Sequence, residues 1–130
     1  MNPIVEKAIS LMIEKFPACS MWNNIDDFLW WYINNDLACF VGRGDEITGL
    51  SLVRPVAKAE DGKKWYDFDR KGDCLYVDFA ISKTKEAKAK LLLTTIEKFP
   101  LKHVAFARTK RSDKINQYSF QEFLNKFIKN

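Results

Sequence analysis

Histidine and cysteine are scarce in this sequence, which has one histidine, His103, and three cysteines among 130 residues. Protein sites for zinc and iron usually need several such ligands at short spacing, and Cys19, Cys39 and Cys74 show no C-x-x-C pattern. We therefore expect no metal site and no disulfide framework, and interpret the cysteines as reduced, buried thiols. A cysteine nucleophile would have only His103 as its base.

Long hydrophobic runs are also absent. No apolar stretch approaches the roughly 20 residues needed to cross a bilayer, and the N-terminus "MNPIVEKAIS" lacks the layout of a signal peptide. Hydrophobic residues make up 47% of the chain and charged residues 29%, which is an ordinary globular composition. We expect a single cytoplasmic domain over residues 1–130.

Positive charge is unevenly distributed. Residues 1–82 hold 9 basic and 13 acidic side chains, whereas residues 83–130 hold 12 basic and 4 acidic ones. The net charges are therefore −4 and +8. A cationic C-terminal third indicates an acidic partner, such as nucleic acid, a phosphate-bearing ligand or an acidic protein. The alternative is a solvated basic face without a partner.

The apolar periodicity predicts an order of elements that starts with two helices. The first covers residues 4–16 and the second follows Asn24, a candidate N-cap. A hairpin of strands over 37–43 and 47–56 follows, then a long polar loop over 57–73 and a strand over 74–81. The C-terminal part is a helix over 84–99, a strand over 102–108, a basic turn over 109–117 and a helix that Ser119 caps, with Glu122 three residues on.

This order predicts an α/β (α+β) fold with a mixed sheet. A strand–helix–strand crossover after a hairpin requires at least one parallel pair, so the strands over 74–81 and 102–108 should lie side by side and run parallel. Helices should cover both faces of the sheet.

One carboxylate interrupts the apolar strand "CLYVDFAI". Asp78 stands in the middle of the run, directly before a helix whose first turns carry Lys83, Lys85 and Lys88. Such a group suits a general base in a cleft. The alternatives are an outward-facing residue, or a structural carboxylate paired with Arg54 or Arg108.

The layout resembles the GNAT acyltransferase superfamily, in which two helices precede an antiparallel meander and a crossover unit that splays to admit a pantetheine arm. That family holds the pyrophosphate of acetyl-CoA on a glycine-rich loop. The corresponding loop here, "ISKTKEAKAK", has no glycine. The resemblance therefore implies acyl-CoA or acyl carrier protein pantetheine as the cofactor, with Lys83, Lys85 and Lys88 supplying positive charge instead of the glycine loop.

Residues 72–81, "GDCLYVDFAI", are similar to a stretch of bacterial toxin-activating lysine acyltransferases, which take a fatty acyl group from acyl carrier protein. Gly72, Asp73 and Asp78 match the family's pattern. The resemblance implies that Asp78 is catalytic, and that Tyr118, which follows the last crossover strand, is a candidate acid. The family's N-terminal histidine has no counterpart here, since no histidine precedes residue 103.

Two functions from different classes follow from these observations. The first is transfer of an acyl group from CoA or acyl carrier protein to an amine. The second is a non-catalytic GNAT-like binding protein whose basic face holds an acidic protein or nucleic acid. The candidate residues for that face are Arg108, Lys110, Arg111 and Lys114, with Tyr118 and Phe120 near enough to stack on bases.

Overall fold

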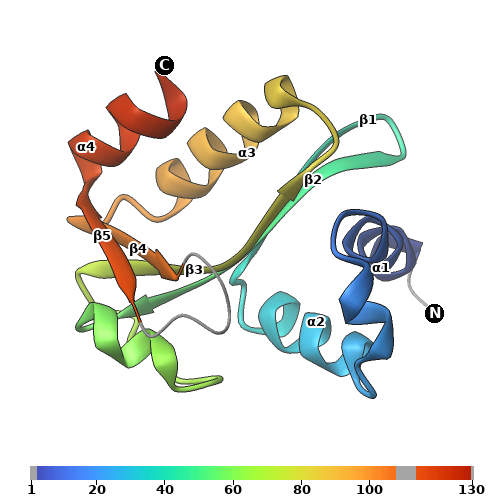
Figure 1. Cartoon of the computed structure of the whole chain (residues 1–130), viewed down its shortest axis with the longest axis horizontal. Helices are drawn as coiled ribbons and strands as arrows, with labels where there is room; N and C mark the ends of the chain where they lie inside the picture. Colours follow the sequence, from blue (N-terminus) through green and yellow to red (C-terminus); the bar gives the residue numbers. More distant parts are fainter. Residues whose placement is uncertain (1–2, 108–113, 130) are drawn as a thin grey trace.

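The computed structural model describes residues 3–107 and 114–129. These residues fold into one five-stranded sheet, with the strand order β1-β2-β3-β4-β5, and into helices that lie on both of its faces (Figure 1). The pair β3–β4 is parallel, and the other three pairs are antiparallel. The mixed sheet and the parallel pair across the crossover confirm the predicted fold class.

The N-terminal half contains two helices and the first hairpin. Helix α1 (Pro3–Lys15) and helix α2 (Ile25–Asn34) are joined through a short 3₁₀ turn, η1 (Pro17–Met21). Strands β1 (Ala38–Arg43) and β2 (Glu46–Val56) follow, joined by a turn in which Gly44 has a φ of +57°. Asn24 occupies the N-cap position of α2, but its side chain makes no capping hydrogen bond.

The C-terminal half contains the crossover. A 3₁₀ turn, η2 (Ala59–Lys63), lies in the long loop before strand β3 (Cys74–Ser82). Helix α3 (Lys85–Lys98) then leads to strand β4 (His103–Ala107). The chain ends with strand β5 (Ile115–Ser119), helix α4 (Phe120–Phe123) and a π-helical turn, η3 (Leu124–Ile128).

Strand β5 was not predicted, because residues 109–117 were interpreted as a basic turn. Its residues Ile115–Ser119 lack the alternation of a half-buried strand, and what holds them is antiparallel pairing with β4. Arg108, Lys110 and Arg111 lie outside the described residues. The predicted cap is confirmed: the Ser119 hydroxyl accepts from the Glu122 backbone N–H, and the Glu122 carboxylate accepts from the Ser119 N–H.

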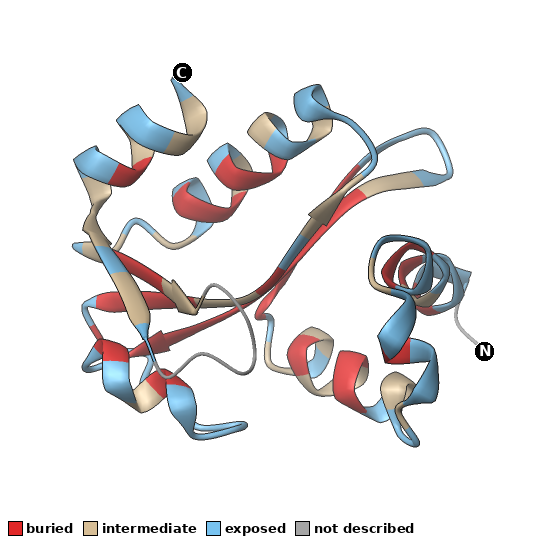
Figure 2. Ribbon diagram, in the orientation of Figure 1, coloured by how far each residue is buried: buried red, intermediate tan, exposed pale blue. Residues whose placement is uncertain are grey.

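The core has two main layers. Helices α1 and α2 cover one face of the sheet, and α3 and α4 cover the other, so that buried residues follow the sheet on both sides (Figure 2). The first layer includes Val5, Ala8, Met12, Leu29, Leu50, Leu52 and Phe79, and the second includes Leu92, Ile96, Val104 and Phe123. No helix among residues 3–107 and 114–129 combines the length and apolar character that a membrane crossing requires.

Candidate functional site

A β-bulge at Asp78 divides strand β3 into two parts. Leu52 of β2 stands opposite Phe79, but the next residue, Val53, stands opposite Val77, so Asp78 is an extra residue on β3. Because side chains alternate along a strand, the extra residue lets Asp78 and Phe79 both face the α1–α2 side. Bulges of this kind are frequent beside active sites, where they redirect a side chain.

The parallel pairing of β3 with β4 ends just before the bulge. It covers three residues of each strand, from Cys74 opposite His103 to Tyr76 opposite Ala105. Strand β3 then continues to Ser82, with β2 as its only paired neighbour among the described residues. We call Val77–Ser82 on the side away from β2 the unpaired β3 edge. A peptide or an amide-containing ligand can extend a sheet along such an edge.

The Asp78 carboxylate is bound on both oxygens. The Nε of Arg54 donates to Oδ2 over 2.7 Å, and Nη2 donates to Oδ1 over 2.7 Å. The Tyr32 hydroxyl also donates to Oδ2, over 2.6 Å. The side chains of Arg54 and Asp78 are 1% and 7% exposed, so this is a buried, bidentate ion pair of the strong type.

Arg54 connects the bulge to the long loop. Beyond Asp78, its guanidinium donates to the backbone carbonyls of Gly62 and Asp67, over 2.6 and 3.0 Å, and to that of Lys64. Its five N–H donors are therefore all used, which satisfies the buried cation. The guanidinium also lies over the Tyr76 ring, 5.4 Å from its centroid.

The protonation states in this cluster follow from burial and charge. Burial, and then the negative charge of Asp78, raise the pKa of Tyr32 well above its usual range. Burial opposes the charge of Arg54, but the hydrogen bonds and the charge of Asp78 outweigh it and raise the pKa of Arg54. Tyr32 and Arg54 are therefore donors, and Asp78 is the acceptor between them. The sequence offered Arg54 as a partner of Asp78, but the role of Tyr32 was missed because Tyr32 lies 46 residues away in the mostly apolar helix α2.

Tyr118 lies on the opposite face of the sheet from Asp78. Its ring packs in the α3–α4 layer, stacked on Phe106 with centroids 5.8 Å apart, and Lys126 Nζ lies 5.1 Å from its centroid. Asp78 instead faces Tyr32 on α2. The structure therefore does not bring the two predicted catalytic residues together, and their roles stay predictions.

The predicted cofactor lysines are in two different settings. Lys83 donates to Glu46 over 2.8 Å, whereas Lys85 and Lys88 are exposed on the first turn of α3. That turn is capped by the Thr84 hydroxyl, which accepts from the Ala87 N–H over 3.0 Å. Lys114, a predicted partner-binding residue, is exposed directly before β5.

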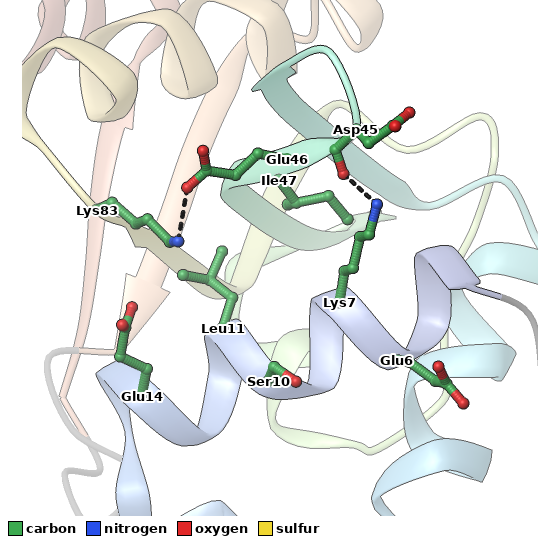
Figure 3. Close-up of a pocket in the computed structure, with 9 residues that line it drawn as sticks. All are labelled: Glu6, Lys7, Ser10, Leu11, Glu14, Asp45, Glu46, Ile47 and Lys83. Carbon is green, nitrogen blue, oxygen red and sulfur yellow. Dashed lines mark hydrogen bonds and ion pairs between the residues drawn. The ribbon is translucent and has the colours of Figure 1, made fainter.

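A groove between α1 and the β1–β2 hairpin has a volume of about 550 Å³ (Figure 3). The Lys83–Glu46 pair closes one end, and Lys7 reaches across from α1 to the backbone carbonyl of Asp45. Glu6 and Glu14 also line it. Because both of its lysines are engaged, this groove is less suited to phosphate groups than the exposed start of α3.

The cysteines are buried free thiols, as predicted. Cys74 and His103 are register partners on β3 and β4, so the structure does bring this pair together. However, burial and then the charge of Glu60 raise the pKa of the Cys74 thiol to about 11, which disfavours the thiolate that a nucleophile needs. In the described part of the chain, no three of the His, Cys, Asp and Glu side chains are grouped closely enough to hold a metal ion.

Solved structures with the same fold are GNAT-like proteins. The GphF GNAT-like decarboxylase in complex with isobutyryl-CoA matches with a TM-score of 0.63 and 13% identity, over 82% of this chain and 62% of that chain. A protein from Staphylococcus aureus Mu50, assigned to the acetyltransferases, matches with a TM-score of 0.52 and 15% identity, over 78% of this chain and 72% of that one. Neither a protein-family model nor a curated protein sequence matches the chain. At these identities the similarity establishes the fold alone.

Proposed function

We propose that this chain binds an acyl thioester of CoA or of acyl carrier protein along the unpaired β3 edge and transfers the acyl group to an amine. The observation that carries the proposal is the end of β3–β4 pairing at Tyr76, next to the bulge at Asp78. In support, the fold is that of GNAT-like proteins, one of which was solved in complex with isobutyryl-CoA.

The chemistry of pantetheine fits a strand edge. Its two amides can exchange hydrogen bonds with backbone groups of Val77–Ser82, as an added strand would. Lys85 and Lys88, exposed at the start of α3, would meet the phosphates of the cofactor by charge, in place of a glycine-rich loop.

The proposed reaction is aminolysis of a thioester. The amine nitrogen attacks the acyl carbon, a C–N bond forms, the C–S bond breaks, and the amine proton is passed on as the thiol leaves protonated. Asp78 is the carboxylate within the unpaired β3 edge, and we retain it as the candidate base. Its bonds to Arg54 and Tyr32 mean that an amine would have to approach a carboxylate that already accepts three hydrogen bonds.

Hydrogen–deuterium exchange tests the donor site without any mutation. With isobutyryl-CoA present, amides in 77–82 should exchange more slowly, whereas amides of α1 should be unchanged. Free adenosine 3′,5′-bisphosphate is the matched control, because it carries phosphates but no pantetheine and should not protect these amides. Equal exchange at 77–82 with and without isobutyryl-CoA would contradict the proposed donor site.

The non-catalytic alternative is favoured by the separation of Asp78 and Tyr118 onto opposite faces of the sheet. In that case the fold would hold an acyl donor or an acidic partner without consuming it. Thioester turnover in the presence and absence of a primary amine separates the two functions, because a binding protein would protect residues 77–82 without releasing thiol.

A further inference from the structure

The segment 63–71 of the long loop lies between two buried glycines. Gly62 packs against the ring of Tyr76, where an added Cβ would lie 2.0 Å from Cδ2. Gly72 packs against the end of β2, where an added Cβ would lie 2.3 Å from the carbonyl oxygen of Val56. Both ends of the segment are therefore fixed to the sheet by close contacts that only glycine allows. The residues between the two ends are mostly exposed.

Backbone hydrogen bonds hold the segment to β2. The Arg54 guanidinium donates to the carbonyls of Lys64 and Asp67. The Asp69 N–H donates to the carbonyl of Pro55 over 2.8 Å. The segment is thus held to β2 by separate hydrogen bonds and not by strand pairing, which is typical of a part of a protein that opens locally.

Phe68 is the side chain of the segment that reaches the core. It is half-buried and packs edge-on against Trp31 of α2, with ring centroids 5.6 Å apart. The Arg70 guanidinium lies 5.1 Å from the Phe68 centroid and donates to the Asn35 carbonyl over 2.7 Å. Tyr66 has a φ of +62°, a left-handed conformation that a bulky residue adopts only at a cost. This position of the segment is therefore strained as well as held.

The pair of Arg54 and Asp78 is closed to solvent next to the segment. Their side chains are 1% and 7% exposed, and the carboxylate already accepts three hydrogen bonds from Arg54 and Tyr32. A general base has to come within about 3 Å of the group whose proton it takes. No acceptor can meet that condition while Arg54 is held in place by both the carboxylate and the segment.

The donors of Arg54 are divided between these two partners. Nε donates to Asp78, Nη1 donates to the segment, and Nη2 donates to Asp78 and to the Gly62 carbonyl. While the segment is down, a turn of the guanidinium away from Asp78 would leave buried polar groups without partners, which is costly. When the segment lifts, water reaches Nη1 and can replace the lost bonds. Movement of the segment and release of the carboxylate are therefore coupled.

We propose that residues 63–71 form a lid that controls access to the Asp78 carboxylate, with Arg54 as the latch between them. The structure shows the lid closed. Opening breaks the bonds to β2 and the contact of Phe68 with Trp31, whereas the glycines at both ends stay packed on the sheet. This inference rests on the proposed function, since it concerns access of the acyl acceptor to the candidate base of that same site.

Chemical labelling measures the lid without any acyl transfer. A water-soluble carbodiimide with glycinamide converts accessible carboxyl groups into amides, and mass spectrometry of the peptides gives the rate at each site. Asp36, whose side chain is 82% exposed, is the internal reference. Asp78 should be labelled about tenfold more slowly than Asp36 or slower still, at a rate set by the fraction of open lid. Equal rates at the two sites would overturn the inference.

Two substitutions loosen the lid in different ways. Phe68→Ala removes the contact with Trp31 and should raise the labelling rate of Asp78 about three- to tenfold. Arg70→Ala removes an exposed hydrogen bond and should raise the rate by a smaller factor, with little change in the unfolding midpoint. An unchanged labelling rate in both variants would overturn the inference.

Two controls separate lid opening from general loosening. Phe127→Ala removes a half-buried ring from the opposite face of the sheet and should leave the labelling rate of Asp78 unchanged. Lid opening exposes little surface, so the rate in the wild type should depend only weakly on urea below the unfolding transition. A rate that rises with urea as steeply as global unfolding does would show that no lid opens, and would overturn the inference.

Acyl transfer separates this inference from the proposed function. An acceptor that binds only when the lid is open has an apparent affinity reduced by the open fraction, so Phe68→Ala should lower the KM for butylamine by about the factor that it raises labelling. Transfer with an unchanged or raised KM would overturn the inference and leave the proposed function standing. Absence of transfer from isobutyryl-CoA in the wild type and the variants would remove the proposed function, and the labelling rates would still decide whether the lid covers Asp78.

Discussion

The ion pair of Arg54 with Asp78 connects strand β3 to the long loop in the candidate site. A buried ion pair is tolerable only when every polar atom has a partner, and here Arg54 uses all five donors. The same pair can serve stability, by holding the loop, and chemistry, by placing a carboxylate beside the unpaired β3 edge. A single substitution distinguishes these roles.

Asp78→Asn should lower the free energy of unfolding by about 3–5 kcal/mol, because it leaves the buried Arg54 cation without its counter-charge. Urea unfolding measures the change. The control is Glu46→Gln, which breaks the exposed pair with Lys83 and should have little effect. A loss for Asp78→Asn no greater than that of the control would contradict the view that the pair holds the loop.

If Asp78 is also the base, acyl transfer by folded Asp78→Asn should fall roughly a hundredfold or more. Arg54→Lys is the comparison, since it keeps the positive charge and the Asp78 carboxylate but loses the fork that binds the loop. A base would make Asp78→Asn far worse than Arg54→Lys in kcat. Equal losses in the two variants would indicate that both residues only position the site.

The buried Cys74 thiol should make the free energy of unfolding fall at alkaline pH. Burial raises the pKa of its thiol to about 11 in the folded chain, above the usual value of about 9. The unfolded chain therefore releases this proton at a lower pH than the folded chain does. The contribution of Cys74 to the free energy of unfolding is fully present below about pH 9 and is lost between about pH 9 and 11, by roughly 2–3 kcal/mol in total. Cys74→Ala should flatten this decline between pH 9 and 10, below the range in which Tyr32 and Tyr76 contribute.

Strand β3 and helix α3 depend on different kinds of contact: β3 on pairing with a distant strand, and α3 on residues close to one another in the sequence. The side chains of β3 alternate between the two faces of the sheet, and the bulge at Asp78 interrupts this alternation. Tyr76, before the bulge, packs against η2, and Phe79, after it, packs in the core formed with α1 and α2. Helix α3 needs only local signals, namely a Thr84 cap and a stripe made of Leu91, Leu92, Thr95 and Ile96. The start of α3 is therefore the element that mutation can change without disturbing the sheet.

Thr84→Ala should cost about 1 kcal/mol of stability, because it removes the acceptor of the Ala87 N–H at the start of α3. Thr84→Ser is the matched control, since it keeps the hydroxyl and should retain most of the stability. Amide exchange should become faster in the first turn of α3 and stay unchanged in α1. Uniform acceleration in both helices would mean that the effect is global and not a lost cap.

For the whole molecule, the charge is divided between an acidic body and a basic C-terminal third. Several lysines of that third are neutralised locally, as in the pairs of Lys83 with Glu46 and Lys98 with Asp36. Lys85 and Lys88 are exposed at the start of α3. The part of the charge that remains is available to an acidic partner.

Binding to such a partner should weaken steeply with salt. Acyl carrier protein and a short duplex DNA, each titrated at 50 mM and 200 mM salt, are the two tests. Lys85→Glu with Lys88→Glu should weaken binding of the carrier protein if the phosphopantetheine enters at α3. DNA binding that weakens with salt, with no binding of the carrier protein at either salt concentration, would favour the nucleic-acid alternative.

Local periodicity and contacts between neighbours along the chain were enough to predict the order of the elements other than β5, the mixed sheet and the cap at Ser119. The sequence also marked Asp78 as unusual and named Arg54 among its partners. The other features arise only when the chain folds: the bulge, the end of β3–β4 pairing, strand β5 and the binding of Asp78 to Tyr32, 46 residues away. The contact between the rings of Trp31 and Tyr66 belongs here too, since these residues meet only after folding. Strand register and buried polar partners are set by contacts between distant segments, and local sequence patterns do not contain these contacts.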